Sequence, residues 1–185
     1  YIPELFQLFD VEDTRRDATF LASYKKDKDG NLSLWGTHVQ KNIGYINSEG
    51  NRVFCGVYAF YRLPWVYLSL AEIANMESDH SGIEKYINLV RKRAYASNWD
   101  ENKHGYKSGD FTQNELAILH EKDKEFVQEG QRWWDVLRMT LTKGGKHLVF
   151  CKEANLKNDG VPILNEATES HKVLWPIEQN MLDKD

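Results

Sequence analysis

Two helical segments joined by a short loop place the strongest constraint on the fold. The first begins near Pro64, a residue suited to the first turn of a helix, and runs to about Glu77. Apolar side chains cover most of its circumference, so we expect this helix to be buried on several sides. The second runs from Ser81, a suitable N-cap, to about Ala96 and carries one apolar stripe. The short connection predicts antiparallel neighbours, a pair about as long as one tetratricopeptide unit.

A single helix pair of this kind cannot bury its own apolar faces, so other elements must cover them. A third helix is predicted to begin at Thr112, where Thr112 and Glu115 fit a capping box, and to stop at Gly130 in the left-handed conformation. A shorter helix from about Arg132 to Thr140 should follow. We expect some packing partners of the helix pair to lie outside this chain.

The N-terminal third carries strand signals instead of helical ones. Segments 18–24 and 32–39 flank an Asp-Gly turn that ends at Gly30, which predicts a β-hairpin. A second glycine turn precedes another extended segment, 52–60, and the chain closes with an extended segment at 173–177. The predicted fold is therefore mainly α, with a tetratricopeptide-like helix pair and a loop-rich region with short β-hairpins.

Composition excludes several classes of protein. The 185 residues are 41% hydrophobic, which is too much for a disordered segment, and no apolar run approaches the roughly 20 residues that span a bilayer. The net charge of −4 gives no field that would attract nucleic acid. Cys55 and Cys151 form neither a CxxC metal pair nor a disulfide framework. No cofactor or metal is implied, because segment 27–33 fits a hairpin turn better than a calcium loop and His120-Glu121 lacks the second histidine of a zinc motif.

Charged residues at helical spacing surround a glycine and a tryptophan pair near the end of the third predicted helix. Because Arg can bind carboxylates through two parallel hydrogen bonds, the pattern predicts a partly buried network of arginine and carboxylate groups. The alternative is a glycoside hydrolase that uses two of the acids about 5–10 Å apart across an open cleft. Burial of these acids in pairs with Arg132 or Arg138 would exclude that enzyme. The acids are Glu121, Glu125, Glu129 and Asp135, and the arginines are Arg132 and Arg138.

This segment resembles the hallmark of the SusD/RagB family, roughly E-R-x-x-E-x-x-x-E-G-x-R-W-x-D-L-x-R. Lys122 and Val136 depart from that pattern. Segments 61–72, 87–94 and 174–177 resemble further family motifs in the expected order, although Glu178 replaces a proline after the last one, and Asp13-Thr14-Arg15-Arg16 is similar to an upstream D-x-R-R. The resemblance assigns structural roles to Glu72, Arg91, Glu125, Glu129, Gly130, Arg132, Trp133, Asp135 and Arg138.

The resemblance implies that residues 1–185 are the C-terminal region of a longer protein with a mainly α-helical, SusD-like fold. It further implies an outer-membrane lipoprotein of Bacteroidetes, held at the cell surface by lipid on an N-terminal cysteine that is neither Cys55 nor Cys151. Such proteins bind a polysaccharide or oligosaccharide, or a peptide in the RagB branch. They deliver this nutrient to a TonB-dependent transporter of the SusC type, and they are not enzymes.

The ligand-binding residues of the family lie in variable loops, so the candidates come from the residues themselves. An exposed Trp or Tyr ring can stack on a sugar ring. Trp99 is best placed, because the polar residues 98 and 100–102 beside it can bind hydroxyl groups. Alternatively, such rings anchor their own loops. The candidates for carbohydrate binding are Trp99, Trp35, Tyr45 and Tyr106, whereas Trp65, Trp133, Trp134 and Trp175 are expected in the core.

A third hypothesis is a helical scaffold that binds only protein. An exposed aromatic shelf would favour a sugar, whereas a broad apolar groove would favour a partner helix. We also expect Arg91 to pair with Glu72 across the helix pair. The sequence does not identify which glycan or peptide is bound.

Overall fold

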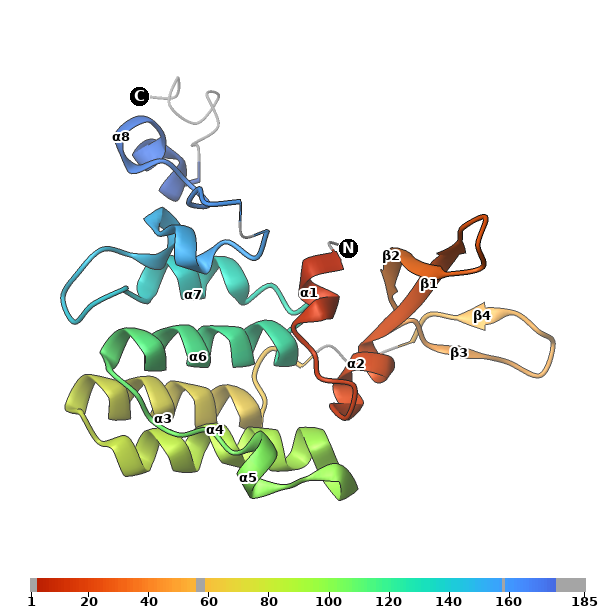
Figure 1. Cartoon of the computed structure of the whole chain (residues 1–185), viewed down its shortest axis with the longest axis horizontal. Coiled ribbons are helices and arrows are strands. Elements are labelled where there is room, and N and C mark those ends of the chain that lie inside the picture. The colour runs from red at the N-terminus through yellow and green to blue at the C-terminus, as the bar shows by residue number, and fades with distance from the viewer. Residues whose placement is uncertain (1–2, 56–58, 158, 176–185) are drawn as a thin grey trace, which may run out of the picture.

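A computed structural model describes residues 3–55, 59–157 and 159–175. Its four longest helices stack side by side in the order α4, α3, α6, α7, and two β-hairpins extend from one end of this stack (Figure 1). The helices are α1 (Pro3–Gln7), α2 (Thr14–Thr19), α3 (Leu63–Glu77), α4 (His80–Tyr95), α5 (Glu101–His104), α6 (Phe111–Glu125), α7 (Arg132–Arg138) and α8 (Glu166–Glu169), and the strands are β1 (Phe20–Lys26), β2 (Leu32–Val39), β3 (Tyr45–Ile46) and β4 (Arg52–Val53). The mainly α class and the helix pair α3–α4 are confirmed.

The helix pair begins where the sequence predicts, but its second helix has a different cap. Pro64 lies in the first turn of α3, as predicted. Helix α4 begins one residue before Ser81, and the side chain of Asp79 accepts a hydrogen bond from the Gly82 N–H at 2.9 Å. The predicted cap at Ser81 is therefore wrong, because the aspartate two residues earlier already binds a free N–H of the first turn.

Helix α6 shows the same kind of difference at its start. Asp110 accepts from the Gln113 N–H at 2.8 Å, and the Gln113 side chain accepts from the Asp110 N–H at 2.9 Å, which is a capping box two residues before the predicted one. The Thr112 hydroxyl donates to the Leu141 carbonyl instead. The helix ends at Glu125, earlier than predicted, and Gly130 adopts its predicted positive φ in the loop before α7.

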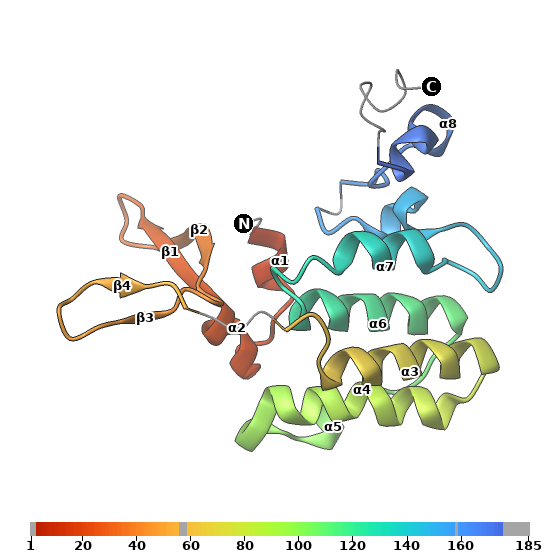
Figure 2. The ribbon, with the colours of Figure 1, turned by 180° about the vertical axis from the view of Figure 1, so that it is seen from behind.

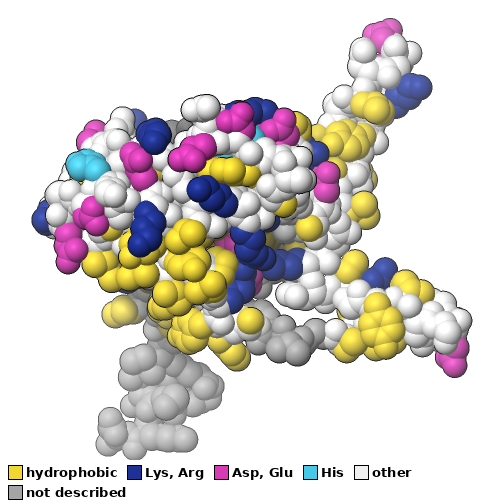
Figure 3. All heavy atoms as spheres, turned by 90° about the horizontal axis from the view of Figure 1, so that it is seen from below, with side chains coloured by type: hydrophobic (Ala, Val, Ile, Leu, Met, Phe, Trp, Pro, Cys, Tyr) yellow, Lys and Arg dark blue, Asp and Glu magenta, His cyan; other side chains and the backbone are white. Residues whose placement is uncertain are grey.

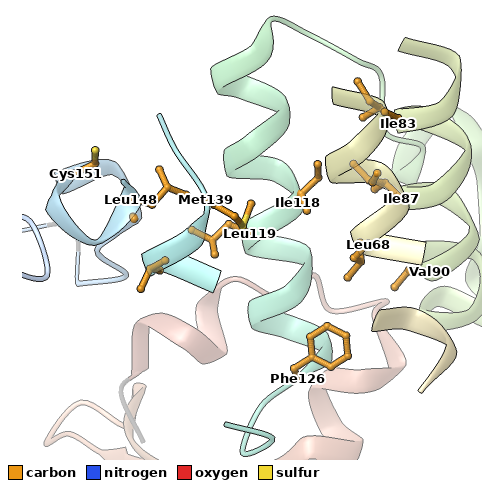
Figure 4. Close-up of a cluster of buried hydrophobic side chains, with 14 of the residues drawn as sticks. Leu68, Ile83, Ile87, Val90, Ile118, Leu119, Phe126, Met139, Leu148 and Cys151 are labelled. Carbon is orange, nitrogen blue, oxygen red and sulfur yellow. The ribbon is translucent and has the colours of Figure 1, made fainter. Parts of the chain in front are cut away.

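The main hydrophobic core lies between the stacked helices and the short turns that follow α7. Leu68 of α3, Ile83 and Ile87 of α4, and Ile118 and Leu119 of α6 are fully buried. Ile118 lies on the side of α6 that faces α3, and Leu119 lies on the other side, beside Met139 (Figure 4). A second, smaller cluster joins α1 to the first hairpin and to the chain after α6. It consists of Leu5, Phe9, Phe20 and Val127. This cluster attaches the N-terminal region to the end of the helical stack at which α6 ends. Figure 2 shows the same arrangement from behind.

The first predicted hairpin is confirmed, with β1 and β2 antiparallel. Its register shifts by one residue, since Ser23 pairs with Gly36 and Tyr24 with Leu34, which leaves Trp35 as the extra residue of a β-bulge. The second hairpin joins β3 and β4. The extended segment predicted at 52–60 is shorter than expected, because strand pairing ends at Val53 within the described residues.

The C-terminal region is irregular, as predicted after α7. In place of the start of an extended segment, a 3-10 turn occupies Ser170–Val173, and Leu174 and Trp175 follow it with their side chains exposed. The rest of the predicted closing segment, Pro176 and Ile177, lies outside the described residues. Over the described part of the chain, no helix is long and apolar enough to cross a membrane.

Candidate functional site

Trp35 is the most exposed of the four aromatic candidates. Its side chain is 73% exposed, although it lies in the middle of β2. A bulge bends the strand and changes the direction in which the extra side chain points. The sequence predicts the hairpin, but the bulge that presents this indole to solvent depends on pairing between strands. Trp35 therefore offers an open ring to a ligand.

Tyr45 lies on the neighbouring hairpin, where it pairs with Val53 across the two strands. Its side chain is exposed, as are the side chains of Ile46 and Phe54 beside it. The two hairpins extend from the same end of the helical stack, so Trp35 and Tyr45 belong to one projecting part of the molecule (Figure 1). Of the four candidates, these two have the accessibility that stacking on a sugar requires.

Trp99 is half-buried beside the end of α4. Its ring meets those of Tyr95 and His104 at centroid distances of 6.3 and 6.1 Å, and the Lys92 ammonium lies 5.6 Å from its centroid. His104 stacks on Tyr95 at 3.9 Å and directs its Nε2 atom toward the carboxylate of Glu12 at 2.9 Å. These contacts hold the loop of residues 96–104 against α4, which is the loop-anchoring role that the sequence left open.

Tyr106 is also half-buried, and its polar groups are already bonded. The hydroxyl donates to Asn114 Oδ1 at 2.7 Å, and the backbone N–H donates to Asn88 Oδ1 at 2.7 Å. The Arg91 guanidinium lies 5.4 Å from the ring centroid. Burial raises the pKa of this phenol above its usual value. The structure thus divides the candidates, with Trp35 and Tyr45 on the hairpins and Trp99 and Tyr106 packed against helices.

Two tryptophans predicted in the core are exposed. Trp133 packs partly against the core, but the adjacent Trp134 is 57% exposed, and Trp175 is 75% exposed. Neighbouring residues of a helix point about 100° apart, so on a helix that is buried on one side only, one ring of a Trp-Trp pair faces solvent. Sequence reasoning also missed the exposed rings of Tyr24, Phe54, Phe60 and Tyr61.

The predicted network of arginine and carboxylate groups is present, and Arg15 of α2 lies at its centre. Its guanidinium donates to Glu121 Oε1 at 2.7 Å, to Glu125 Oε2 at 2.9 Å and to Asp13 Oδ2 at 2.6 Å. Glu121 is completely buried, and Arg91 pairs with it at 2.9 Å. The prediction that Arg91 pairs with Glu72 is therefore wrong, since Glu121 of the neighbouring helix occupies the guanidinium.

The network continues along the end of α6 and into α7. Glu125 also accepts from Arg62 and from Arg93, and Glu129 accepts from Arg62 and Lys41. A second cluster joins α3, α6 and α7. In it Lys122 contacts Glu72 at 2.5 Å and Asp135 at 2.7 Å, Arg138 binds both acids, and Arg132 pairs with Asp123 at 2.7 Å.

The electrostatics of the network keep its central acid charged. Burial opposes the charge of Glu121, but Lys124, Arg15 and Arg91 outweigh burial and hold its pKa well below the usual range. The same balance, with Arg15 and Arg62 as the cations, lowers the pKa of Glu125. A carboxylate that is fully buried and bonded to several cations cannot protonate a sugar oxygen or activate water.

The glycoside hydrolase alternative therefore has no acid pair among the four acids proposed for it. Glu121, Glu125 and Asp135 are buried, and the Glu129 carboxylate is bonded to Arg62 and Lys41. A hollow of about 280 Å³ lies beside these charges and is lined by two acids, Asp123 and Asp135. Asp123 is paired with Arg132, and Asp135 is paired with Lys122 and Arg138. Within the described ranges, no group of three or more His, Cys, Asp or Glu side chains is arranged to hold a metal ion.

Comparison with known proteins gives consistent matches. The model of the SusD family matches residues 12–185. A SusD superfamily protein from Bacteroides fragilis has a solved structure with 67% sequence identity and a TM-score of 0.95, and the match covers 100% of this chain and 38% of that one. None of the curated proteins matches.

Two further solved structures are similar at lower identity. A SusD superfamily protein from Bacteroides vulgatus has 26% identity and a TM-score of 0.69, with 100% of this chain and 38% of that chain covered. NanU from B. fragilis has 28% identity and a TM-score of 0.65, with 98% of this chain and 36% of that chain covered. The present chain thus spans a little more than one third of the length of these proteins.

Proposed function

This chain belongs to the SusD family, and from that premise we propose that it is part of a cell-surface protein that captures a glycan nutrient. Binding would occur by stacking and hydrogen bonds, without bond breaking. The observation that carries this proposal is the exposed indole of Trp35 on the bulge of β2, with Tyr45 exposed on the adjacent hairpin. Flat rings accessible from solvent are suited to the C–H face of a sugar.

We further propose that the chain is the C-terminal region of a longer protein. The length of the solved relatives supports this, since the match covers 38% of the B. fragilis and B. vulgatus chains. The longer protein would carry an N-terminal lipid anchor in the outer membrane and would deliver its ligand to a SusC-like, TonB-dependent transporter. Copurification of the full-length protein with such a transporter from outer membranes would test the partner. Mutation of the N-terminal cysteine that accepts the lipid should remove the protein from the outer membrane, which would test the anchor.

The peptide-binding alternative of the RagB type has one supporting feature. Each hairpin has two strands, so the outer edges of β1 and β2 carry backbone groups that an extended peptide could pair with. Exposed aliphatic side chains such as Leu21 and Leu32 lie on the same strands. A peptide would then bind by adding a strand, and loss of a single aromatic ring would weaken it little.

A binding panel separates these alternatives. The full-length protein is tested by calorimetry against soluble polysaccharides, their oligosaccharides and a set of unstructured peptides. Glycan binding without peptide binding supports the proposal, whereas saturable binding of peptides alone would replace it with the peptide alternative. Failure to bind any glycan would contradict the proposed function.

A further inference from the structure

A second hollow, of about 550 Å³, lies between α1, α6 and the irregular chain that follows α7. Glu4 and Gln7 line it from α1, where they stand three residues apart on one face of the helix. His120 of α6 lines it from the helical stack, and Glu153 and Lys157 line it from the irregular chain. We name this space the α1 hollow.

The polar side chains of the α1 hollow are available to a ligand. Over the described part of the chain, the side chains of Glu4, Gln7, His120 and Glu153 form neither a hydrogen bond nor an ion pair. His120 is half-buried, and burial lowers the pKa of its imidazole, so the ring is neutral at pH 7 and has one donor and one acceptor. Groups of this kind, gathered in one hollow, are the polar contacts that orient a small ligand.

The mixture of donors and acceptors selects the class of ligand. The carboxylates of Glu4 and Glu153 can only accept hydrogen bonds, the ammonium of Lys157 can only donate them, and the amide and the imidazole can do both. A cation would satisfy the carboxylates but would leave the donors without acceptors, and an anion would be repelled by the two carboxylates. The hydroxyl groups of a sugar both donate and accept, and Leu8 and Leu156 in the same hollow can contact its C–H groups. An uncharged sugar therefore matches the lining of the hollow.

The two walls of the α1 hollow are held in place by contacts within the protein. The turn that carries Glu153 is held on α7, because Arg132 Nη2 donates to the Ala154 carbonyl at 2.5 Å. On the other side, the Phe6 ring of α1 meets the Phe20 ring of β1 edge-on, with their centroids 5.8 Å apart, so α1 and the first hairpin form one packed unit. Figure 3 shows both hairpins projecting from the helical body, with hydrophobic side chains on each. A site whose walls are already ordered loses less conformational entropy on binding.

We infer that the α1 hollow binds one or two sugar units of an uncharged glycan, as a second contact besides the indole of Trp35. This inference rests on the proposed glycan-binding function and narrows the ligand to an uncharged one. The volume of about 550 Å³ lies within the range of about 300–1,000 Å³ that is usual for small-molecule sites. A glycan chain that reaches both Trp35 and the hollow gains affinity from each contact.

Substitutions of exposed side chains in the hollow test this inference. The full-length protein is titrated by calorimetry with soluble starch, inulin, galactomannan and β-glucan as uncharged probes, and with chitosan oligomers as cationic ones. Gln7→Ala and Glu153→Ala are then compared with the wild type on the uncharged probe that binds most tightly. Each variant loses one hydrogen bond to a sugar hydroxyl, so each should weaken binding roughly fivefold. Both side chains are exposed, and Lys157→Ala replaces Glu153→Ala if that variant does not fold.

The control and the outcomes separate this inference from the proposed function. Glu77→Ala, which removes an exposed glutamate at the end of α3, should bind as the wild type does. Unchanged affinity in Gln7→Ala and Glu153→Ala would overturn the inference, and weaker binding by Trp35→Ala in the same experiment would leave the proposed function intact. Binding of chitosan alone would also overturn it, because the ligand would then be a cation. If no glycan binds, the proposed function fails and the inference fails with it.

Discussion

Arg15 is a cation that three buried acids share. It donates to Asp13, Glu121 and Glu125, of which Glu121 is completely buried. Removing one partner of a buried ion pair typically costs about 3–5 kcal/mol. Because Arg91 still binds Glu121 and Arg62 still binds Glu125, the lower end of that range, about 3 kcal/mol, is expected. We expect Arg15→Ala to lower the free energy of unfolding of the full-length protein by this amount, measured by urea denaturation.

Arg16, the next residue in the same helix, is the matched control. It pairs with Asp17, whose side chain is largely exposed, and its guanidinium lies 5.6 Å from the centroid of the Phe6 ring. A surface pair and an exposed cation–π contact each contribute about 1 kcal/mol or less. Arg16→Ala should therefore shift the urea midpoint much less than Arg15→Ala. Equal shifts for the two variants would show that the buried network does not have the structural role described above.

Glu115 makes a pH-dependent contribution to stability. Burial and the neighbouring Glu72 raise its pKa from 4.5 to about 7. Since the folded pKa lies above the unfolded one, the folded protein holds a proton that the unfolded chain releases. This contribution is fully present below about pH 4.5 and is lost as the pH rises through 7.

Glu115→Gln removes that contribution while keeping a polar side chain for the hydrogen bond from Asn75. The free energy of unfolding of the variant, relative to the wild type, should rise by about 3 kcal/mol between pH 4 and pH 8. The difference between the two proteins cancels the opposite pH dependence of Glu121 and Glu125. A constant difference across this range would contradict the raised pKa of Glu115.

At the scale of single elements, the start of α4 distinguishes the cap predicted from sequence from the cap in the structure. Asp79 binds the Gly82 N–H, so Asp79→Ala should lower the free energy of unfolding by about 1 kcal/mol. Ser81→Ala, within the first turn, should change it by less than about 0.5 kcal/mol. Thermal denaturation of both variants checks this. A larger loss of stability for Ser81→Ala than for Asp79→Ala would show that Ser81 is the N-cap, as the sequence predicted.

The elements with strong local signals were predictable from the sequence. Pro64 and the apolar periodicity placed α3, and the Asp-Gly turn placed the first hairpin. Their details were not predictable where several residues compete for one role, as Asp79 and Ser81 do, or Asp110 and Thr112. The β-bulge at Trp35 depends on cross-strand register, which no local pattern encodes.

At the scale of the whole molecule, the network and the aromatic residues depend on contacts between distant parts of the chain. The spacing of Glu121 and Glu125 indicated an ion-pair network, but not that Arg15 would bind both acids or that Arg62 would bind Glu125, each from more than 60 residues away. Likewise, Trp99 and Tyr106 are half-buried because α4 and α6 lie beside them, and these neighbours cannot be read from the loop sequence.

The central claim is that the exposed indole of Trp35 binds a glycan, and the affinity of the full-length protein for its best glycan tests this claim most directly. Trp134 is the matched control, because it is an exposed tryptophan on a different element, α7. Loss of a ring that stacks on a sugar is worth about 1 kcal/mol, so Trp35→Ala should weaken binding roughly five- to tenfold and Trp134→Ala should leave it unchanged. Unchanged affinity in Trp35→Ala, or an equal loss in both variants, would contradict the claim.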